Sequence, residues 1–279
     1  MILIIDAGST KMEWALVDGN EVILRFTTEG FNPNYSAPER LCLMLEHQLP
    51  AIMPPALQSV YYYGTGCGAE KNRQMVASAF RQRFAGADIH VTHDMMAAAH
   101  AVLGKEKGIA CILGTGANSC VYDGEKIVEK AVSLGYMAGD EGSGTYIGRE
   151  IVKSYFYGFM PEQLRKQFSE KYQLSVDDFV TQLYHLTQPN RYLASFAPFA
   201  GEYQHHPFIN DLIRRCFDAF IQAFICRYND CKTLKVSFVG SVAYHFRDIL
   251  KSCLKAKNIT MGEVLQNPME GLIKYHALD

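Results

Sequence analysis

The sequence lacks the features that mark several large classes of protein. Its formal net charge is −2 and it contains no block of like charges, so nothing in it favours nucleic acid as a partner. No apolar run approaches the length that spans a membrane, and no basic segment with an apolar core opens the chain. We therefore expect a cytoplasmic protein with neither a membrane nor a nucleic-acid partner.

The sequence also lacks a recognisable arrangement of cysteines. Its eight cysteines form no C-x-x-C pair and show no zinc-type spacing with histidine. Reduced and mostly buried thiols are the default for scattered cysteines of this kind. The sequence therefore predicts neither a disulfide framework nor a zinc site.

The size of the chain sets the domain count. A chain of 279 residues with 48% hydrophobic content can bury a substantial core. This length suits two domains better than one.

The N-terminal stretch reads as three strands joined by tight turns. An apolar run over residues 2–5 ends in Asp6, a glycine-hydroxyl turn occupies residues 7–11, and an apolar segment resumes at residues 12–17. Residues 18–20 give a second turn before another strand over residues 21–26. The first turn exposes backbone N–H groups that can cradle a phosphate.

The same pattern begins again at residue 109. Strand, glycine-hydroxyl turn and strand recur over residues 109–122, and an Asp-Gly turn and a third strand follow up to residue 128. We interpret the recurrence as a divergent internal duplication. One hairpin from each half can then face a nucleotide in a cleft between the halves.

Strands and helices alternate between the two meanders. Residues 60–63 and 89–92 read as strands, and residues 70–84 and 95–101 read as helices, which is typical of an α/β fold. Asp94 stands where the second of these strands ends and its helix begins. It can serve as a general base at the edge of a cleft or as the N-cap of the helix, and the local sequence leaves both roles open.

The second half contains a glycine-rich stretch followed by helical patterns. Glycines at the density seen over residues 139–148 let the backbone approach a ligand, and a helix from about Tyr146 would present its N-terminus to an anion. Helical patterns then dominate residues 151–228, with helices predicted over residues 151–156, 161–173 and 176–184 and one long helix over residues 208–228. Residues 236–239 read as a strand, the next four as a turn, residues 244–256 as a helix, and the chain closes with a helix that starts near residue 267.

Taken together, these motifs resemble the N-acetylglucosamine kinase branch of the BadF/BadG/BcrA/BcrD ATPase family, part of the actin-like superfamily of sugar kinases and chaperone ATPases. The resemblance covers essentially the whole chain. The motifs that carry it, in order, are Asp6 to Lys11, Asp94, Gly114-Thr115-Gly116, Gly139 to Gly144, Gly240-Ser241-Val242-Ala243 and Pro268-Met269-Glu270-Gly271.

The resemblance implies an α/β fold of two ribonuclease-H-like (actin-like ATPase) domains with an interdomain cleft. We expect an N-terminal domain over residues 1–104 and a C-terminal domain over residues 105–279, with a helical insert at about 150–230 and a last helix that packs back on the N-terminal domain. The aromatic surface of residues 208–228 is sufficient for a homodimer interface.

The resemblance also implies a role for each motif. Asp94 occupies the position of the catalytic base, and Asp6 lies near a Mg²⁺ ion through water. The remaining assignments are ATP phosphate binding by Gly8, Ser9, Thr10, Lys11, Gly114, Thr115 and Gly116; adenosine binding by Gly240, Ser241, Val242 and Ala243; and sugar binding by Asn32, Asn118 and Asp140. Asn34 competes with Asn32 for its role.

The implied function is an ATP- and Mg²⁺-dependent kinase that phosphorylates a hydroxyl, expected to be the 6-hydroxyl, of N-acetylglucosamine or a related amino sugar. One alternative is the other branch of the family, ATPases that activate 2-hydroxyacyl-CoA dehydratases and carry an iron-sulfur cluster. That role requires a cysteine close to Asp94, and residues 92–95 contain none. A second alternative is a chaperone-like or cytoskeletal ATPase, which needs a partner-binding module that this chain is too short to include.

Overall fold

The computed structural model describes residues 1–50, 53, 54 and 56–277, which form two compact units. The first unit combines Met1–Gly104 with Pro268–Asp279, and the second comprises Lys105–Asn267. Among the described residues, no helix has the length and apolar character that crossing a membrane requires.

The first unit is built on a five-stranded mixed sheet with the order β3-β2-β1-β4-β5. Its strands are β1 (Ile2–Ala7), β2 (Lys11–Asp18), β3 (Glu21–Glu29), β4 (Ser59–Gly64) and β5 (Asp88–His93). The first three strands form an antiparallel meander, and β1, β4 and β5 run parallel. All five strands were predicted from the apolar runs.

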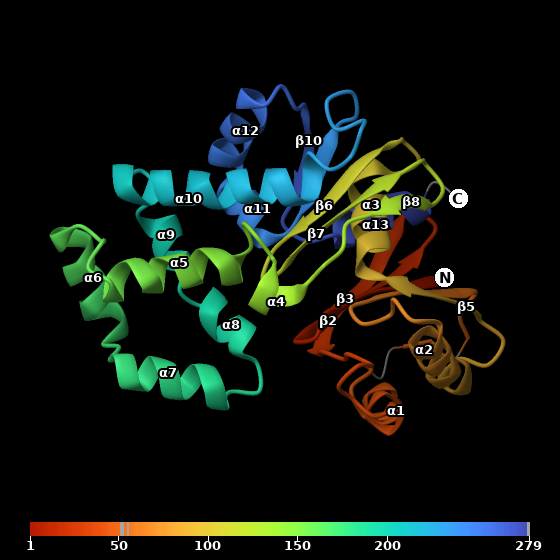
Figure 1. Cartoon of the computed structure of the whole chain (residues 1–279). Helices are drawn as coiled ribbons and strands as arrows, with labels where there is room; N and C mark the ends of the chain where they lie inside the picture. The colour runs from red at the N-terminus through yellow and green to blue at the C-terminus, as the bar shows by residue number, and fades with distance from the viewer. Residues whose placement is uncertain (51–52, 55, 278–279) are drawn as a thin grey trace. The chain divides into compact units, whose positions relative to one another are not determined.

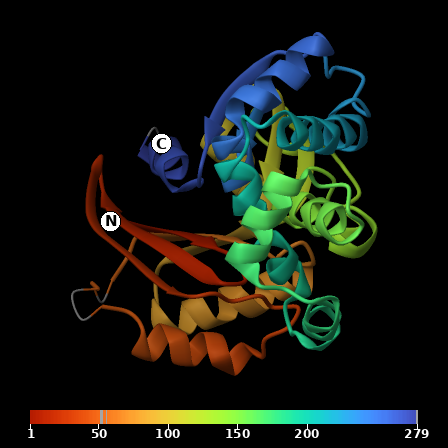
Figure 2. The ribbon, with the colours of Figure 1, turned by 90° about the vertical axis from the view of Figure 1, so that its left-hand side faces the viewer.

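Helices cover both faces of the first sheet. They are α1 (Pro38–His47), α2 (Glu70–Arg83), α3 (Asp94–Leu103) and α13 (Met269–Ala277). Figure 2 shows α1 and α2 together on one face and α13 on the other. The buried side chains of Trp14, Tyr62 and Phe80 form the centre of the core beneath α1 and α2. On the other face α13 approaches α3 so closely that a Cβ on Gly271 would lie 2.2 Å from the Ala101 carbonyl oxygen.

The second unit repeats this sheet. Its strand order is β10-β9-β6-β7-β8, with an antiparallel meander β6-β7-β8 and parallel strands β6, β9 and β10, as in the first sheet (Figure 1). The strands are β6 (Gly108–Leu113), β7 (Ala117–Tyr122), β8 (Ile127–Lys130), β9 (Val236–Val239) and β10 (Met261–Leu265). The shared topology confirms the duplication that the sequence predicts. Strand β10 was not predicted.

Outside the sheet, most of the second unit is helical. They are α4 (Gly135–Ala138), α5 (Gly144–Phe156), α6 (Glu162–Tyr172), α7 (Val176–His185), α8 (Pro189–Ala194), α9 (Ala197–Glu202), α10 (Pro207–Phe220), a π-helix (Ile221–Ile225), α11 (Ser241–His245) and α12 (Arg247–Ala256). Helices α4, α8 and α9 were not predicted. The helix predicted over residues 208–228 ends in the π-helix, and the one predicted over 244–256 is divided at Phe246.

The cysteines agree with the sequence prediction. All eight lie within the described part of the chain, all are free thiols, and six of them are buried. Burial raises the pKa of Cys67, Cys120 and Cys216 to about 12, so these thiols stay neutral at physiological pH.

Candidate active site

In the first unit, the site forms where three parallel strands end at one edge of the sheet. Gly64 pairs in register with Ala7 on one side and with His93 on the other. The residues that follow these three positions therefore emerge next to one another, and the N–H of Thr65 extends the ladder to the Ala7 carbonyl over 2.9 Å. Asp94, which comes after His93, is placed at this edge by the same register.

Asp94 is the first residue of α3. One carboxylate oxygen accepts a hydrogen bond from the Met95 N–H (2.9 Å), and the other accepts one from the Thr65 hydroxyl (3.2 Å). The prediction that Asp94 is the N-cap of this helix is wrong, because His93 occupies the N-cap position and Asp94 is already helical. Each carboxylate oxygen retains a lone pair after these two bonds and can therefore still accept a proton. The short side chain is fixed at a partly exposed position.

The predicted first phosphate loop is the turn between β1 and β2. Its Gly8 N–H donates to the Lys11 carbonyl over 3.0 Å, which closes the hairpin. Ser9 and Thr10 are exposed at its tip. Gly30 supports the turn from behind, since its N–H donates to the Thr10 carbonyl and a Cβ there would lie 2.3 Å from the turn's backbone.

Asn32 and Asn34 occupy different environments. The side chain of Asn32 is buried and donates from Nδ2 to the Ser9 hydroxyl over 2.9 Å. Asn34 is exposed, and its Oδ1 accepts from Nδ2 of Asn72 on α2. Asn32 is therefore bonded directly to the predicted phosphate loop, whereas Asn34 is bonded to the scaffold.

Asp6 is the penultimate residue of β1, and its carboxylate lies close to other negative charges. Burial, together with the negative charges of Glu13 and Asp94, raises its pKa from 3.8 to about 7. A cation would relieve this excess of carboxylates. In the described residues no three or more His, Cys, Asp or Glu side chains cluster closely enough to hold a metal ion. That is compatible with Mg²⁺, which keeps several waters and needs only one or two protein carboxylates beside substrate phosphates.

In the second unit, the corresponding hairpin between β6 and β7 is held by the start of α5. The N–H groups of Gly144 and Thr145 donate to the carbonyls of Gly114 and Thr115, over 2.8 Å and 3.2 Å. The Thr145 hydroxyl also donates to the Thr115 carbonyl. Thr115 itself is exposed at the tip.

The prediction that this helix offers its N-terminus to an anion is wrong. Helix α5 begins at Gly144, two residues before the predicted start, and its first N–H groups bond to the hairpin. The next N–H, that of Tyr146, donates to the Ser143 hydroxyl. The neighbouring glycines serve close packing within the unit: a Cβ on Gly148 would lie 1.9 Å from the Leu193 carbonyl oxygen of α8.

The two predicted sugar-binding residues of this unit flank the hairpin. Asp140 is buried, adopts a left-handed backbone with φ 58°, and accepts the Ala117 N–H at Oδ1 over 3.3 Å. Its carboxylate also lies against Gly116, and burial raises its pKa. Asn118 is half-buried on β7, where its Oδ1 accepts from the Ser119 N–H.

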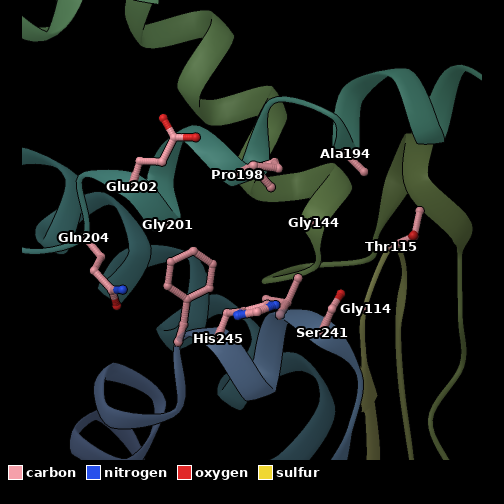
Figure 3. Close-up of a pocket in the computed structure, with 13 residues that line it drawn as sticks. Gly114, Thr115, Gly144, Ala194, Pro198, Gly201, Glu202, Gln204, Ser241 and His245 are labelled. Carbon is pink, nitrogen blue, oxygen red and sulfur yellow. The ribbon is translucent and has the colours of Figure 1, made fainter. Parts of the chain in front are cut away.

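A cavity of about 480 Å³ brings two predicted motifs of the second unit together (Figure 3). Gly114 and Thr115 of the hairpin and Ser241 and Val242 of the predicted adenosine turn line it. The remaining lining residues are Gly144, Ala194, Ala197, Pro198, Gly201, Glu202, Gln204, His245 and Phe246. The volume falls within the range of small-molecule sites.

Gly240 is the residue of the predicted adenosine turn whose backbone surroundings leave no room for a side chain. Its φ is 133°, and a Cβ there would lie 2.4 Å from the Leu113 carbonyl oxygen and 2.9 Å from the Gly114 N atom. We expect Gly240→Ala to displace the hairpin and to weaken ADP binding at least about tenfold, measured by calorimetry. The matched control is Gly201→Ala in the same cavity, where the nearest atom to a new Cβ is 3.8 Å away. Equal affinities for the two variants would contradict this expectation.

Sequence reasoning missed three parts of the site. Thr65 and Gly66 follow the strand predicted over residues 60–63 and were given no role, although a glycine-hydroxyl pair after a parallel strand was a usable signal. Helix α9 and the end of α8, which line the cavity, were also missed.

Several solved structures are similar to this chain. The "putative N-acetylglucosamine kinase" of Porphyromonas gingivalis has 41% sequence identity and a TM-score of 0.95, covering 100% of this chain and 99% of that one. A protein of the same description from Chromobacterium violaceum has 17% identity and a TM-score of 0.74, covering 98% of each chain. A ROK family transcriptional regulator, at 13% identity and TM-score 0.64 over 99% of this chain and 78% of that one, shares the fold alone. No protein-family model matches, and no curated protein matches.

Two ribonuclease-H-like units, each with a glycine-hydroxyl hairpin after its first strand, form the actin-like ATPase fold, and the 41%-identical relative places the chain among the phosphotransferases of that fold. The Porphyromonas relative then identifies the family. The chain belongs to the N-acetylglucosamine kinase-like branch of the BadF/BadG/BcrA/BcrD ATPase family, and it is a sugar kinase.

Proposed function

We propose that this chain transfers the γ-phosphoryl group of ATP to the 6-hydroxyl of N-acetylglucosamine or a closely related amino sugar. The observation that carries the proposal is the edge of the first sheet, where a fixed carboxylate, Asp94, lies at the same strand ends as the hairpin of residues 8–11. The relative of 41% identity, which aligns with the whole of this chain, is described as a "putative N-acetylglucosamine kinase".

In the proposed reaction, Asp94 accepts the proton of the attacking sugar hydroxyl. Phosphoryl transfer depends mainly on positioning and on neutralising charge, so a single oriented base and two backbone hairpins are sufficient protein machinery. Asp6 would hold a Mg²⁺ ion through water, and this ion would supply the positive charge that neutralises the phosphates. The backbone and hydroxyl groups of residues 8–11 and 114–116 would bind the phosphates.

The other assignments complete the proposal. Residues 240–243 bind adenosine, and Asn32, Asn118 and Asp140 bind the sugar. We assign the sugar contact to Asn32 over Asn34, because Asn32 bonds the Ser9 hydroxyl of the hairpin while Asn34 bonds Asn72. The iron-sulfur ATPase branch is not favoured, since Thr92 to Met95 contain no cysteine and the 41%-identical relative is described as a kinase.

A panel of acceptors tests the function. The protein is incubated with ATP and Mg²⁺ and with N-acetylglucosamine, N-acetylmannosamine, glucosamine, N-acetylmuramic acid or glucose, and both ADP and sugar phosphate are measured. We expect ADP release to depend on sugar and to be fastest with N-acetylglucosamine. The control acceptor, 6-deoxy-N-acetylglucosamine, should bind without being phosphorylated. ADP release that ignores the sugar, or transfer to the 6-deoxy sugar, would contradict the proposal.

A further inference from the structure

The turn after β4 connects the main groups of the first unit's site. Thr65 is the first residue after β4, and its N–H donates a hydrogen bond to the carbonyl of Ala7, the last residue of β1. Its hydroxyl donates to Oδ2 of Asp94 over 3.2 Å. The Thr65 hydroxyl is the one side-chain donor recorded on this carboxylate within the described residues.

The next residue meets the side chain of Asn32. Gly66 has a φ of 83°, and a Cβ there would lie 2.3 Å from the Asn32 Oδ1. Asn32 in turn donates to the Ser9 hydroxyl. Thr65 and Gly66 therefore lie between the carboxylate and the hairpin that the proposed function uses.

The turn is also held rigidly from α2. Nδ2 of Asn72 donates to the Gly66 carbonyl over 2.8 Å, and the Arg73 guanidinium donates to the carbonyls of Cys67 and Gly68. Asn72 is buried. A hydroxyl fixed by a rigid backbone can restrict the rotation of a carboxylate that it touches, whereas a hydroxyl on a mobile loop cannot.

We propose that Thr65 is a positioning residue for phosphoryl transfer, whose hydroxyl holds the Asp94 carboxylate in the orientation that accepts the sugar proton. The Met95 N–H fixes one carboxylate oxygen and Thr65 fixes the other, so removal of the hydroxyl leaves the carboxylate free to turn about a single remaining bond. This inference rests on the proposed function and assigns a role to a residue outside its predicted set.

The test compares Thr65→Val with Thr65→Ser. Valine preserves the shape of threonine and removes the hydrogen bond, while serine keeps the hydroxyl. We expect Thr65→Val to lower kcat about 10- to 100-fold, the value of a hydrogen bond to a charged group, with KM for ATP and sugar within about threefold of wild type. Thr65→Ser should restore kcat to within about threefold of wild type.

Controls separate this inference from its alternatives. Thr92→Val makes the same substitution on the neighbouring strand β5 and should leave kcat unchanged. ADP affinity and thermal midpoint establish that each variant is folded. A kcat of Thr65→Val within twofold of wild type, or a kcat of Thr65→Ser as low as that of Thr65→Val, would overturn the positioning role. If the wild-type protein still phosphorylates the sugar in that case, the proposed function is unaffected. A wild-type protein that phosphorylates no sugar would overturn both.

Discussion

Asp94→Asn is expected to lower kcat at least about a hundredfold while ATP and sugar still bind. Asparagine has the size of aspartate, and its amide oxygen can still accept one hydrogen bond from Thr65 or Met95. It cannot accept a proton from a sugar hydroxyl at neutral pH. Turnover is measured as sugar-dependent ADP release, and binding of each substrate is measured by calorimetry.

The matched control is Asp88→Asn, which removes an exposed carboxylate at the other end of β5. It should leave kcat unchanged. Near-normal turnover of Asp94→Asn would eliminate Asp94 as the base. Loss of substrate binding in that variant would instead assign Asp94 to the binding of the sugar.

Asp6 is expected to make the nucleotide-free protein less stable as pH rises from about 4 to about 7. Folding raises its pKa from 3.8 to about 7, so in this window the folded state holds a proton that the unfolded state releases. At 1.36 kcal/mol per pKa unit, the upper limit of this destabilisation at pH 8 is about 4 kcal/mol. The side chain of Asp6 is partly exposed, so the actual loss of stability is smaller.

The measurement is the free energy of unfolding of wild type and Asp6→Asn in urea at pH 4.5 and pH 8, without nucleotide or metal. The stability advantage of the asparagine variant should grow by about 2–3 kcal/mol between the two pH values. The control is Asp88→Asn, at an exposed position of the same sheet. Its free energy of unfolding relative to wild type should not change between the two pH values. A difference between wild type and Asp6→Asn that does not change with pH would show that the site does not destabilise the Asp6 carboxylate.

The strands of both meanders were predictable because local sequence determines them. Each is an apolar run bounded by glycine, asparagine or aspartate, and tight antiparallel connections leave little choice of partner. Strand β10 was missed because Gly262 and Glu263 interrupt its apolar residues, and it is paired as a strand only through contact with β9.

Helices α8 and α9 were missed for a related reason. Pro189, Pro198 and Gly201 are turn residues in local sequence, yet the helices form because Leu193 and Phe199 are buried in the core of the second unit. Packing between distant segments overrides propensity here.

The individual site residues were easier to nominate than their surroundings. Asp94 and the two hairpins are visible in the sequence as a strand end and as turn residues, and their predicted roles come from the resemblance to the kinase family. The glycines of residues 142–148 were interpreted as ligand contacts, whereas Gly142 faces Phe220 and Gly148 faces Leu193. A sequence shows that a glycine permits a close approach, but not which backbone approaches it. The hydrogen bond between Thr65 and Asp94 depends on the register of β4 with β5, which no local pattern specifies.

The return of α13 to the first unit constrains how the chain can be made. Met269 and Leu272 are fully buried in a unit whose other residues all precede Lys105. During translation every residue of the second unit therefore leaves the ribosome before α13 does. Until α13 emerges, the surface of α3 that it covers stays exposed. The unit whose synthesis begins first can thus complete its fold only after the whole second unit has been synthesised.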